Sequence, residues 1–489
     1  MRWIVTKVVK NLLWNMGYQV FILLLPIVTI PYVSRVLGPT GIGINAFTNS
    51  IVQYFVLFGT LGLTMYGNRE VAYQRDNPKR LSGLFWELTL LRLVTTGIAT
   101  LLYLGFILLS GEYQAFYLIQ GLLLVATAID VSWFFQGLEE FRITVLRNTL
   151  VKIISLILIF VLVRTKNDLW LYILILTGSQ VLGNLTLVPY LKKYVVVPHW
   201  SDLKVIDHLR PTIEMFVPQI ATQVYLQVNK TMLGTLVGVQ ASGFYDNSDK
   251  IVKILLAVVT ATGTVLLPHT AHSFAQGRRD EVEASLNKSM HFILVIAFPM
   301  TAGLAGIAPL FTQIFFGKGF DPVANLLVIE SIVIVLIGIS NATGVQYLLP
   351  TNQLRPFTTS VVLGAVANMV LNVPFILIWD SNGAMIATVL SELLVTTYQL
   401  VYVRKQISLN RIFIEVEKYV VASVVMGVSV RMFIMVLPSY NIRVLIGVIL
   451  YGTFVYCIAL AILRPNVLAK MVLEFRDKHG STSTAKRYK

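Results

Sequence analysis

Positively charged side chains inside long apolar stretches are the first candidates for chemistry in this sequence. Arg92 lies near the middle of the apolar stretch 81–110, and Lys250 and Lys253 lie in the stretch 245–270. A charge at that depth in an apolar environment is costly, so it usually faces the protein interior or a water-filled cavity. Cations gathered on a cavity wall would bind an anionic group such as a phosphate-bearing headgroup.

Each isolated arginine has two interpretations. Arg92 lines a cavity, or it forms a structural ion pair with Asp130 in the next stretch or with Glu87 on its own helix. Arg35 lies just before the turn Gly38-Pro39, so it faces the cavity or extends its charged end to the membrane surface. The pattern alone leaves both choices open.

The richest polar cluster joins the end of the stretch 211–238 to the start of 245–270. Lys250 and Lys253 are three residues apart and share one helical face, and Asp246, four residues before Lys250, can partly neutralise it. With Lys230 in the earlier stretch, these lysines form a cationic wall for an anionic headgroup, or an ion-pair network that locks the two helices together.

Amide side chains form a second pattern. Asn45, Asn49 and Gln53 repeat every four residues and place one polar stripe along an otherwise apolar helix. The stripe contacts sugars in a cavity, or it supplies hydrogen bonds between helices, worth about 0.6 kcal/mol each. Acidic groups at membrane depth would balance the cations or carry a coupling proton. The acidic groups concerned are Asp130, Asp246, Glu330 and Glu392, and Arg431 also lies at membrane depth.

Several chemistries lack their parts in this sequence. No Gly-x-x-x-x-Gly-Lys-Ser/Thr loop is present, so we do not expect ATP hydrolysis by this chain. His269 and His272 share a helical face without a third histidine or a cysteine nearby, so we expect no metal site. The single cysteine, Cys457, excludes a disulfide framework. We expect no cofactor, and coupling to a proton or a sodium ion stays open.

Composition indicates where these groups lie. Of 489 residues, 56% are hydrophobic and 13% are charged, against roughly 25% charged in ordinary soluble domains. Mean hydropathy is +0.74, which leaves too little polar surface to coat a water-soluble body. We therefore predict an all-α polytopic membrane protein with about fourteen transmembrane helices. The expected stretches are 12–37, 43–66, 81–110, 115–136, 148–163, 169–191, 211–238, 245–270, 289–309, 324–349, 357–379, 383–403, 419–437 and 444–463.

Charges outside these stretches predict the orientation. The termini and the connections on their side carry 28 Lys and Arg residues, and the opposite side carries 4. Because positively charged connections stay in the cytoplasm, we expect both termini there, in a multi-pass protein of the cell membrane. The net charge of +15 is then mainly a topology signal, so membrane lipids are expected partners and nucleic acid is not. The first stretch lacks a small-residue cleavage site and is expected to be a retained helix.

The sequence resembles itself at an offset of 200 residues. Gly38 then aligns with Gly238 and Gly43 with Gly243, and both segments join the first two helices of a half through a tight turn. Either the halves are related by an axis along the membrane normal, or glycine-rich turns match by chance. We predict two pseudo-symmetric six-helix lobes, 1–205 and 206–405, and a terminal helix pair with a basic tail, 406–489. Alternating access would rock one lobe against the other.

Several segments carry a family resemblance. LPIVTIPYVSRVLGPTGIG (25–43) closely resembles the first helix and turn of Wzx-type polysaccharide flippases, in the polysaccharide branch of the multidrug/oligosaccharidyl-lipid/polysaccharide exporter superfamily. YGNREVA (66–72) is similar to the loop after their second helix, and VPQIA (217–221) and KTMLG (230–234) are similar to their second-lobe pattern. Where the family often has an aspartate before this lysine, the chain has Asn229, which favours a fixed positive charge at Lys230.

The resemblance implies transport of an undecaprenyl-diphosphate-linked oligosaccharide repeat unit from the inner to the outer leaflet, for capsule, exopolysaccharide or O-antigen assembly. It also implies a polysaccharide polymerase and assembly proteins as partners. In that interpretation the cations attract the diphosphate, the amide stripe contacts sugars, and the carboxylates set charge balance or coupling. An ion-coupled drug or small-molecule exporter with the same fold is the alternative. A membrane polysaccharide polymerase or glycosyltransferase is disfavoured because the outer connections are short.

Overall fold

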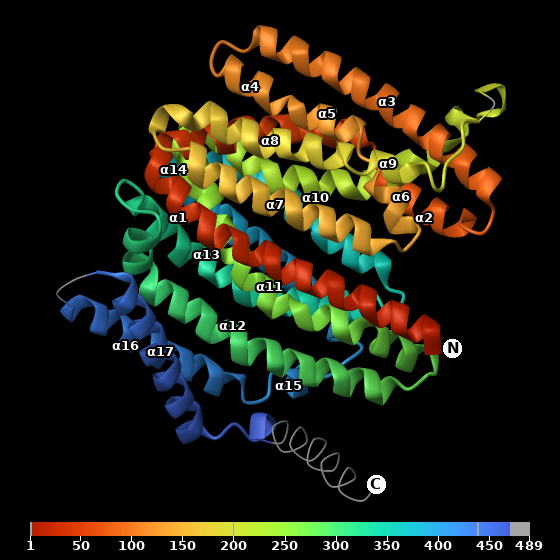
Figure 1. Ribbon diagram of the computed structural model, residues 1–489. Helices are drawn as coiled ribbons and strands as arrows, with labels where there is room; N and C mark the ends of the chain where they lie inside the picture. The colour runs from red at the N-terminus through yellow and green to blue at the C-terminus, as the bar shows by residue number, and fades with distance from the viewer. Residues whose placement is uncertain (1, 199, 438–439, 470–489) are drawn as a thin grey trace, which may run out of the picture. The chain divides into compact units, whose positions relative to one another are not determined.

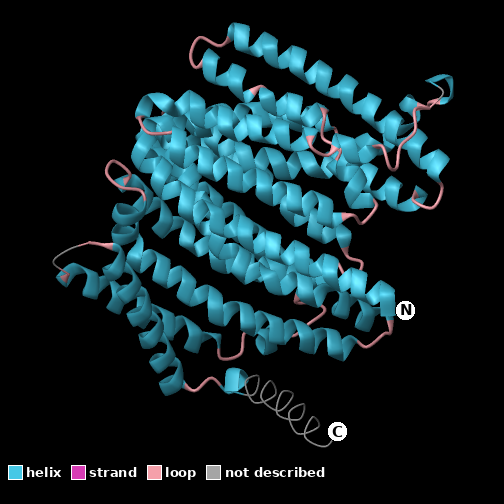
Figure 2. Cartoon of the chain, in the orientation of Figure 1, coloured by secondary structure: helices cyan, strands magenta, loops and turns pink. Residues whose placement is uncertain are grey.

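The described part of the chain is helical throughout. The computed structural model describes residues 2–198, 200–437 and 440–469, and over these residues Figure 2 shows helices joined by loops and turns. The predicted all-α fold is confirmed. The chain divides into two compact units, Met1–Gly243 and Phe244–Lys489.

The first unit packs its helices around α1, which contacts α3, α5, α7 and α10 (Figure 1). Aromatic side chains of α3 and α6 and apolar residues of α1, α4 and α5 fill its interior. The helices are α1 (Arg2–Thr60), α2 (Leu63–Gln74), α3 (Pro78–Leu109), α4 (Gln114–Gln120), α5 (Leu122–Ala128), α6 (Ser132–Gly137), α7 (Phe141–Leu162), η1 (Lys166–Asp168), α8 (Leu169–Leu185), α9 (Val188–Leu191), η2 (Trp200–Asp202), η3 (Val205–His208), α10 (Leu209–Leu236) and the start of α11 (Val239–Ala275).

The second unit is centred on α12, which packs against α13, α16 and α17. Apolar residues of α12, α16 and α17 form one continuous core. After the end of α11, its helices are α12 (Arg279–Phe315), α13 (Asp321–Ser340), the π-helical η4 (Asn341–Leu348), α14 (Leu354–Val403), α15 (Leu409–Ile412), α16 (Val416–Val436) and α17 (Ile442–Leu463).

Glu415 joins the start of α16 to the segment that follows α17. Its carboxylate accepts hydrogen bonds from Lys418 Nζ at 2.6 Å, Asn466 Nδ2 at 2.9 Å and the backbone N–H of Val467 at 3.1 Å. Desolvation by burial raises the pKa of Glu415, but these donors outweigh it and hold that pKa below its ordinary value. The ionised carboxylate therefore fixes this connection.

Two of the long helices are each bent at one residue. Gly38 takes φ 67° and ψ 179° inside α1, immediately before Pro39, and Asp380 takes φ 51° and ψ −131° inside α14. Pro39 has no backbone N–H to donate, and glycine reaches a positive φ at little cost, so the Gly38-Pro39 sequence breaks the helix where the first turn was expected. Each bent helix therefore contains two of the expected stretches.

Ten of the described helices are long and apolar enough to cross a membrane, against about fourteen expected. The difference has two sources. The bent helices each combine two expected stretches, and α10 and α11, which contain 211–238 and 245–270, are not among the ten. Of these two, α10 carries Gln, Asn and Lys side chains around Lys230, which lower its apolar character.

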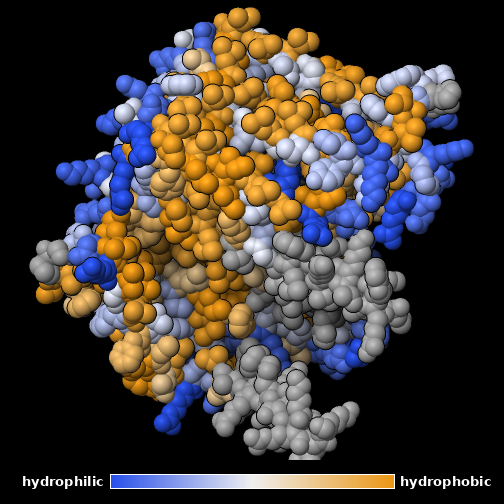
Figure 3. All heavy atoms as spheres, in the orientation of Figure 1, coloured by the Kyte–Doolittle hydropathy of each residue, from blue (hydrophilic) through white to orange (hydrophobic). Residues whose placement is uncertain are grey.

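Large apolar side chains are exposed on helices of both units. Leu101 and Leu109 of α3 are 71% and 90% exposed, and Leu450 of α17 is 65% exposed. Figure 3 shows such residues over much of the visible surface. Water-soluble proteins rarely expose contiguous apolar patches of this extent, whereas hydrocarbon solvates them. The chain is a multi-pass membrane protein.

The residues paired by the 200-residue offset contact each other within the first unit. The Nε2 of Gln240 donates a hydrogen bond to Thr40 Oγ1 at 2.9 Å. A Cβ built on Gly243 would lie 2.8 Å from the Cα of Gly43, and one on Gly43 would lie 2.1 Å from the backbone oxygen of Val239. The two glycines are therefore required because two backbones cross there at close range.

We predict that Gly43→Ala destabilises the protein by roughly 1–3 kcal/mol, because its Cβ meets rigid backbone. Gly83→Ala is the matched control: it lies in α3, a Cβ there has nothing within 4 Å, and loss of a helical glycine should stabilise by about 0.5–1 kcal/mol. Thermal unfolding of both purified variants in one detergent would check this. Equal unfolding temperatures would contradict the crossing.

Candidate functional site

The side chain of Arg92 on α3 is held inside the first unit by contacts with Asp130, Thr64 and Trp133, which together are called the Arg92 clasp. Its side chain is 2% exposed. Nη1 donates to the backbone oxygen of Asp130 at 2.5 Å and lies 3.5 Å from the Asp130 carboxylate, and Nη2 donates to Thr64 Oγ1 at 2.9 Å. The guanidinium carbon lies 6.0 Å from the Trp133 ring centre, and Asp130 Oδ1 accepts the Ser132 N–H at 2.9 Å. The pair with Asp130 is therefore present.

The alternative pairing of Arg92 with Glu87 is wrong. Glu87 instead accepts the backbone N–H of Lys204 at 2.8 Å and lies 2.9 Å from His208 Nε2, while Tyr66 Oη lies 2.8 Å from His208 Nδ1. Five residues separate Glu87 from Arg92, which turns the helix about 140° beyond one full turn, so the two side chains point to different faces. Through these contacts, Glu87 joins α3 to residues 204–208, which precede α10.

Two members of the amide stripe on α1 hydrogen bond to Gln120 of α4. Asn49 Nδ2 donates to Gln120 Oε1 at 3.2 Å, and Gln120 Nε2 donates to Asn45 Oδ1 at 3.2 Å. Gln120 is 1% exposed, so these bonds join helices in the interior. Gln53 is half-buried and makes no hydrogen bond to any residue that the structure describes.

Arg35 and Lys230 lie on different helices of the first unit. Arg35 is exposed, just before the bend in α1, and Lys230 of α10 is half-buried. Thr231, the residue after Lys230, joins α10 to α1. Its hydroxyl lies 2.9 Å from the Ser50 hydroxyl and 3.1 Å from the Tyr54 hydroxyl. Lys230 is thereby held at a defined position along α1.

Both lysines of α11 form ion pairs along their own helix. Lys250 pairs with Asp246, as expected from the four-residue spacing, and Lys253 Nζ lies 2.6 Å from Asp249 Oδ2. The Asp246 side chain is 8% exposed, whereas Lys250 and Lys253 remain 43% and 47% exposed. The carboxylates anchor the lysines and leave their charged ends accessible.

A buried carboxylate lies across from α11. Glu330 of α13 is 2% exposed and accepts a hydrogen bond from Ser248 Oγ at 2.6 Å. The sequence identified Glu330 as lying at membrane depth but gave no sign of Ser248, because this contact depends on which helices pack together. Glu392 of α14 is half-buried.

The helix α7 carries Arg147 and Lys152, neither of which the sequence pattern singled out as a site residue. The helix was expected from 148, but it begins at Phe141, so Arg147 lies inside it and not in a loop. Arg147 Nη1 donates to Asn184 Oδ1 of α8 at 2.9 Å. Lys152 lies further along α7. Apolar residues before 148 continue the helical period and could have revealed the earlier start.

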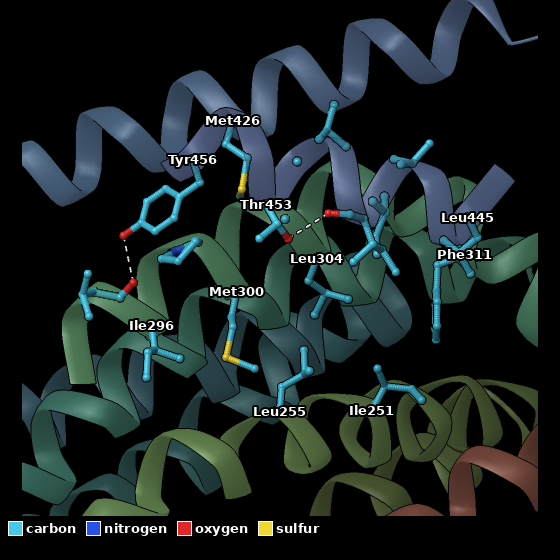
Figure 4. Close-up of a pocket in the computed structure, with 18 residues that line it drawn as sticks. Ile251, Leu255, Ile296, Met300, Leu304, Phe311, Met426, Leu445, Thr453 and Tyr456 are labelled. Atoms are coloured by element: carbon cyan, nitrogen blue, oxygen red, sulfur yellow. Dashed lines mark hydrogen bonds between the residues drawn. The ribbon is translucent and has the colours of Figure 1, made fainter. Parts of the chain in front are cut away.

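The second unit contains an apolar pocket of about 530 Å³. Figure 4 shows side chains of four helices, α11, α12, α16 and α17, around this space. Tyr456 turns its hydroxyl out of the lining by donating to the backbone oxygen of Val295 at 2.8 Å, so the ring presents an apolar surface. Residues that line the pocket include Ile251, Leu255, Met300, Gly303, Phe311 and Met426.

Over the described ranges, no three His, Cys, Asp or Glu side chains come together as a group that could hold a metal ion. Taken separately, the first unit contains cations and amides, and the second contains the lysine pair of α11 and the apolar pocket. Apolar outer faces show a polytopic membrane protein, and charges held inside its helical units are typical of transporters.

The chain belongs to the family of polysaccharide biosynthesis proteins, because the model of that family matches residues 8–274, more than half of the chain. The putative O-antigen transporter of Escherichia coli (strain K12) is 25% identical over 392 residues, which cover 78% of this chain and 93% of that protein. The lipid II flippase MurJ of Bacillus subtilis (strain 168) is 27% identical over 187 residues, 37% of this chain and 34% of that protein.

Solved structures share the fold. A structure of the lipid II flippase MurJ in an inward closed conformation matches with a TM-score of 0.70 at 14% identity, covering 94% of this chain and 100% of that one. An inward-facing multidrug transporter of the MATE family matches with a TM-score of 0.61 at 13% identity, covering 79% and 95%. The family resemblance seen in the sequence is confirmed.

We predict that Arg92→Met and Lys250→Met separate structural from surface charges. Loss of Arg92 leaves buried partners unpaired and should cost roughly 3 kcal/mol or more of unfolding free energy. Loss of Lys250 removes a partner of the buried Asp246 carboxylate, but it should cost less than loss of Arg92, because Lys250 itself is 43% exposed. Thermal unfolding of both purified variants checks the difference, and an Arg92→Met protein as stable as the wild type would contradict the clasp.

Proposed function

We propose that this protein moves an oligosaccharide carried on undecaprenyl diphosphate from the inner to the outer leaflet of the membrane. The observation that carries the proposal is the accessible lysine pair of α11, Lys250 and Lys253, anchored by Asp246 and Asp249. A diphosphate needs cations because hydrocarbon does not solvate its charge. The relatives named as an O-antigen transporter and a lipid II flippase support the same class of cargo, and neither name is that of an enzyme.

The cationic residues divide into two roles in this proposal. In the second unit Lys250 and Lys253 attract the diphosphate, and in the first unit Lys230 and the exposed Arg35 do so. Arg92 acts through its clasp: it holds Asp130 in place and adds positive charge to the interior of the first unit. This division follows burial, because only an accessible cation can exchange its partner for a phosphate.

The amides and carboxylates complete the assignment. Gln53 contacts sugars, since its amide makes no hydrogen bond within the described part of the chain. Asn45 and Asn49 hold α4 against α1 through Gln120 and contact sugars from these fixed positions. Asp130, Asp246 and Glu392 balance the cations, and a carboxylate among them couples transport to a proton or a sodium ion.

The apolar pocket of the second unit would hold part of the polyprenyl chain. Ile251 and Leu255, which line the pocket, alternate along α11 with Lys250 and Lys253. Adjacent residues on a helix point about 100° apart, so one helix presents lysines for the headgroup beside a wall for the tail. A long apolar chain gains free energy there in proportion to the apolar area that it buries.

The cellular setting follows from the charge distribution. With 28 Lys and Arg on the side of the termini and 4 on the other, both termini lie in the cytoplasm and the protein resides in the cell membrane. The cargo serves capsule, exopolysaccharide or O-antigen assembly, in which a polymerase and further assembly proteins act on the externalised repeat units.

Depletion of the protein in its host tests the function. We expect complete lipid-linked oligosaccharides to accumulate on the cytoplasmic leaflet, measured by lipid extraction and an assay of which leaflet holds them. Unchanged lipid-linked sugars would contradict the proposal and favour small-molecule export. Units that appear outside but stay unpolymerised would contradict it in favour of polymerisation.

Filling the pocket should impair transport. We expect Gly303→Leu to reduce externalisation at least about tenfold, because the new side chain occupies the space for the lipid chain. Gly447→Leu on α17 is the matched control, since a Cβ there meets nothing within 4 Å and the residue is exposed. Externalisation by Gly303→Leu at the wild-type rate, with equal amounts of protein in the membrane, would rule out the pocket as a tail site.

A further inference from the structure

The segment between α9 and α10, residues 192–208, exposes four large apolar side chains. They belong to Val196, Val197, Trp200 and Ile206. A single exposed apolar residue is common on any protein, but a group of them within one short connection marks a surface that another molecule or an apolar layer covers. This connection therefore has a face that is suited to an environment other than bulk water.

The segment is fixed to the first turns of α3, beside which it runs in Figure 1. Ser82 Oγ donates to the backbone oxygen of Val196 at 2.6 Å and accepts the backbone N–H of the same residue at 2.8 Å. Trp86 Nε1 donates to that oxygen at 3.1 Å, and the Trp86 ring packs against the Trp200 ring with centres 5.5 Å apart. Because both backbone groups of Val196 are satisfied by α3 while its side chain stays exposed, the apolar face is a built feature of the fold.

These contacts place the segment near the edge of the hydrocarbon. The helix α3 has 32 residues and is about 48 Å long, whereas a hydrocarbon core of about 30 Å takes about 20 residues. Its exposed apolar side chains run from Leu93 to Leu109, and about 20 residues counted back from Leu109 reach about residue 90. Ser82, Trp86 and Glu87, which hold the segment, therefore lie roughly 5–12 Å beyond the hydrocarbon, at the level of the lipid headgroups.

The segment and the first turn of α3 carry more positive than negative charge. The exposed cations are Lys79, Arg80, Lys192, Lys193 and Lys204. The acidic residues of the segment are Asp202 and Asp207. Each Lys or Arg close to a surface of anionic lipid contributes about 1 kcal/mol of attraction, and tryptophan is enriched where headgroups meet hydrocarbon. A layer of anionic headgroups over hydrocarbon therefore matches both the cations and the apolar side chains.

We propose that residues 192–208 lie on the membrane surface beside α3 and bind anionic phospholipids there. The lysines contact the lipid phosphates, while Val196, Val197 and Trp200 enter the boundary with the hydrocarbon. The partner is the surrounding lipid and not the transported molecule, because these side chains are exposed on the outside of the first unit. A water-soluble protein docked on the same face is the competing occupant, and the experiment below distinguishes the two.

Quenching of one fluorescent label tests the position of the segment. Cys457 is the single cysteine of the sequence, so Val197→Cys in a Cys457→Ser background carries one thiol for a bimane label. The full-length protein is placed in phosphatidylcholine nanodiscs with a fraction of phosphatidylcholine that bears a nitroxide near the headgroup. We expect this lipid to quench the label at 197 at least about threefold more than a label at Asp280→Cys, an exposed position in the first turn of α12.

Aqueous iodide should give the opposite order. Quenching at 197 by iodide and not by the nitroxide lipid would place the segment in water and overturn the proposal. Protection of the label from both quenchers would overturn it as well, because the face would then be covered by protein.

A comparison of two lipids tests the charge. Nitroxide phosphatidylglycerol should quench the label at 197 about twofold or more beyond nitroxide phosphatidylcholine at the same mole fraction. Combined Lys192→Gln, Lys193→Gln and Lys204→Gln should abolish this preference without changing the quenching by phosphatidylcholine. Lys405→Gln, which removes an exposed lysine from the turn after α14, should preserve it.

Two results of this comparison overturn the lipid assignment. Equal quenching by the two lipids in the wild-type background excludes a specifically anionic partner. A preference that persists in the triple variant excludes these lysines as its source. Unfolding temperatures equal to that of the parent protein confirm that the variants differ from it in charge and not in folding.

Discussion

Hydrocarbon offers no partner to a polar group, and this constraint governs the arrangement of the described helices. Each backbone group must be satisfied within a helix, and each charge at membrane depth needs a partner or a polar cavity. The clasp of Arg92 meets the second demand with a carbonyl, a carboxylate and a hydroxyl from other segments. The clasp thereby joins α3 to the segments around Asp130 and Thr64.

The fold also requires the backbones of α1 and the start of α11 to pass very close to each other. Gly43 and Gly243 meet where two backbones cross, and their partners in the repeat, Thr40 and Gln240, are joined by a hydrogen bond. Residues 200 positions apart therefore lie together at this crossing. Any side chain larger than hydrogen at either glycine would separate the segments that carry the polar stripe of α1 and the start of α11.

Charged side chains in the two units find their partners in different ways. In the second unit, aspartates one helical turn away hold Lys250 and Lys253 and leave them accessible, and the apolar pocket begins on the adjacent face of the same helix. In the first unit, Arg92 is fully enclosed, whereas the lysines of residues 192–208 are exposed. Burial and pairing therefore separate structural charges from those suited to bind a ligand.

Much of this protein follows from the sequence by itself. Composition and apolar stretches determined the all-helical membrane architecture, because only helices satisfy their own backbone in lipid, and four-residue spacing determined the Asp246–Lys250 pair, because it acts within one helix. Partners on different helices were decided by the tertiary structure alone: His208 for Glu87, Gln120 for Asn45 and Asn49, Ser248 for Glu330. The period of a helix states which residues share a face, but the packing of side chains decides which faces meet.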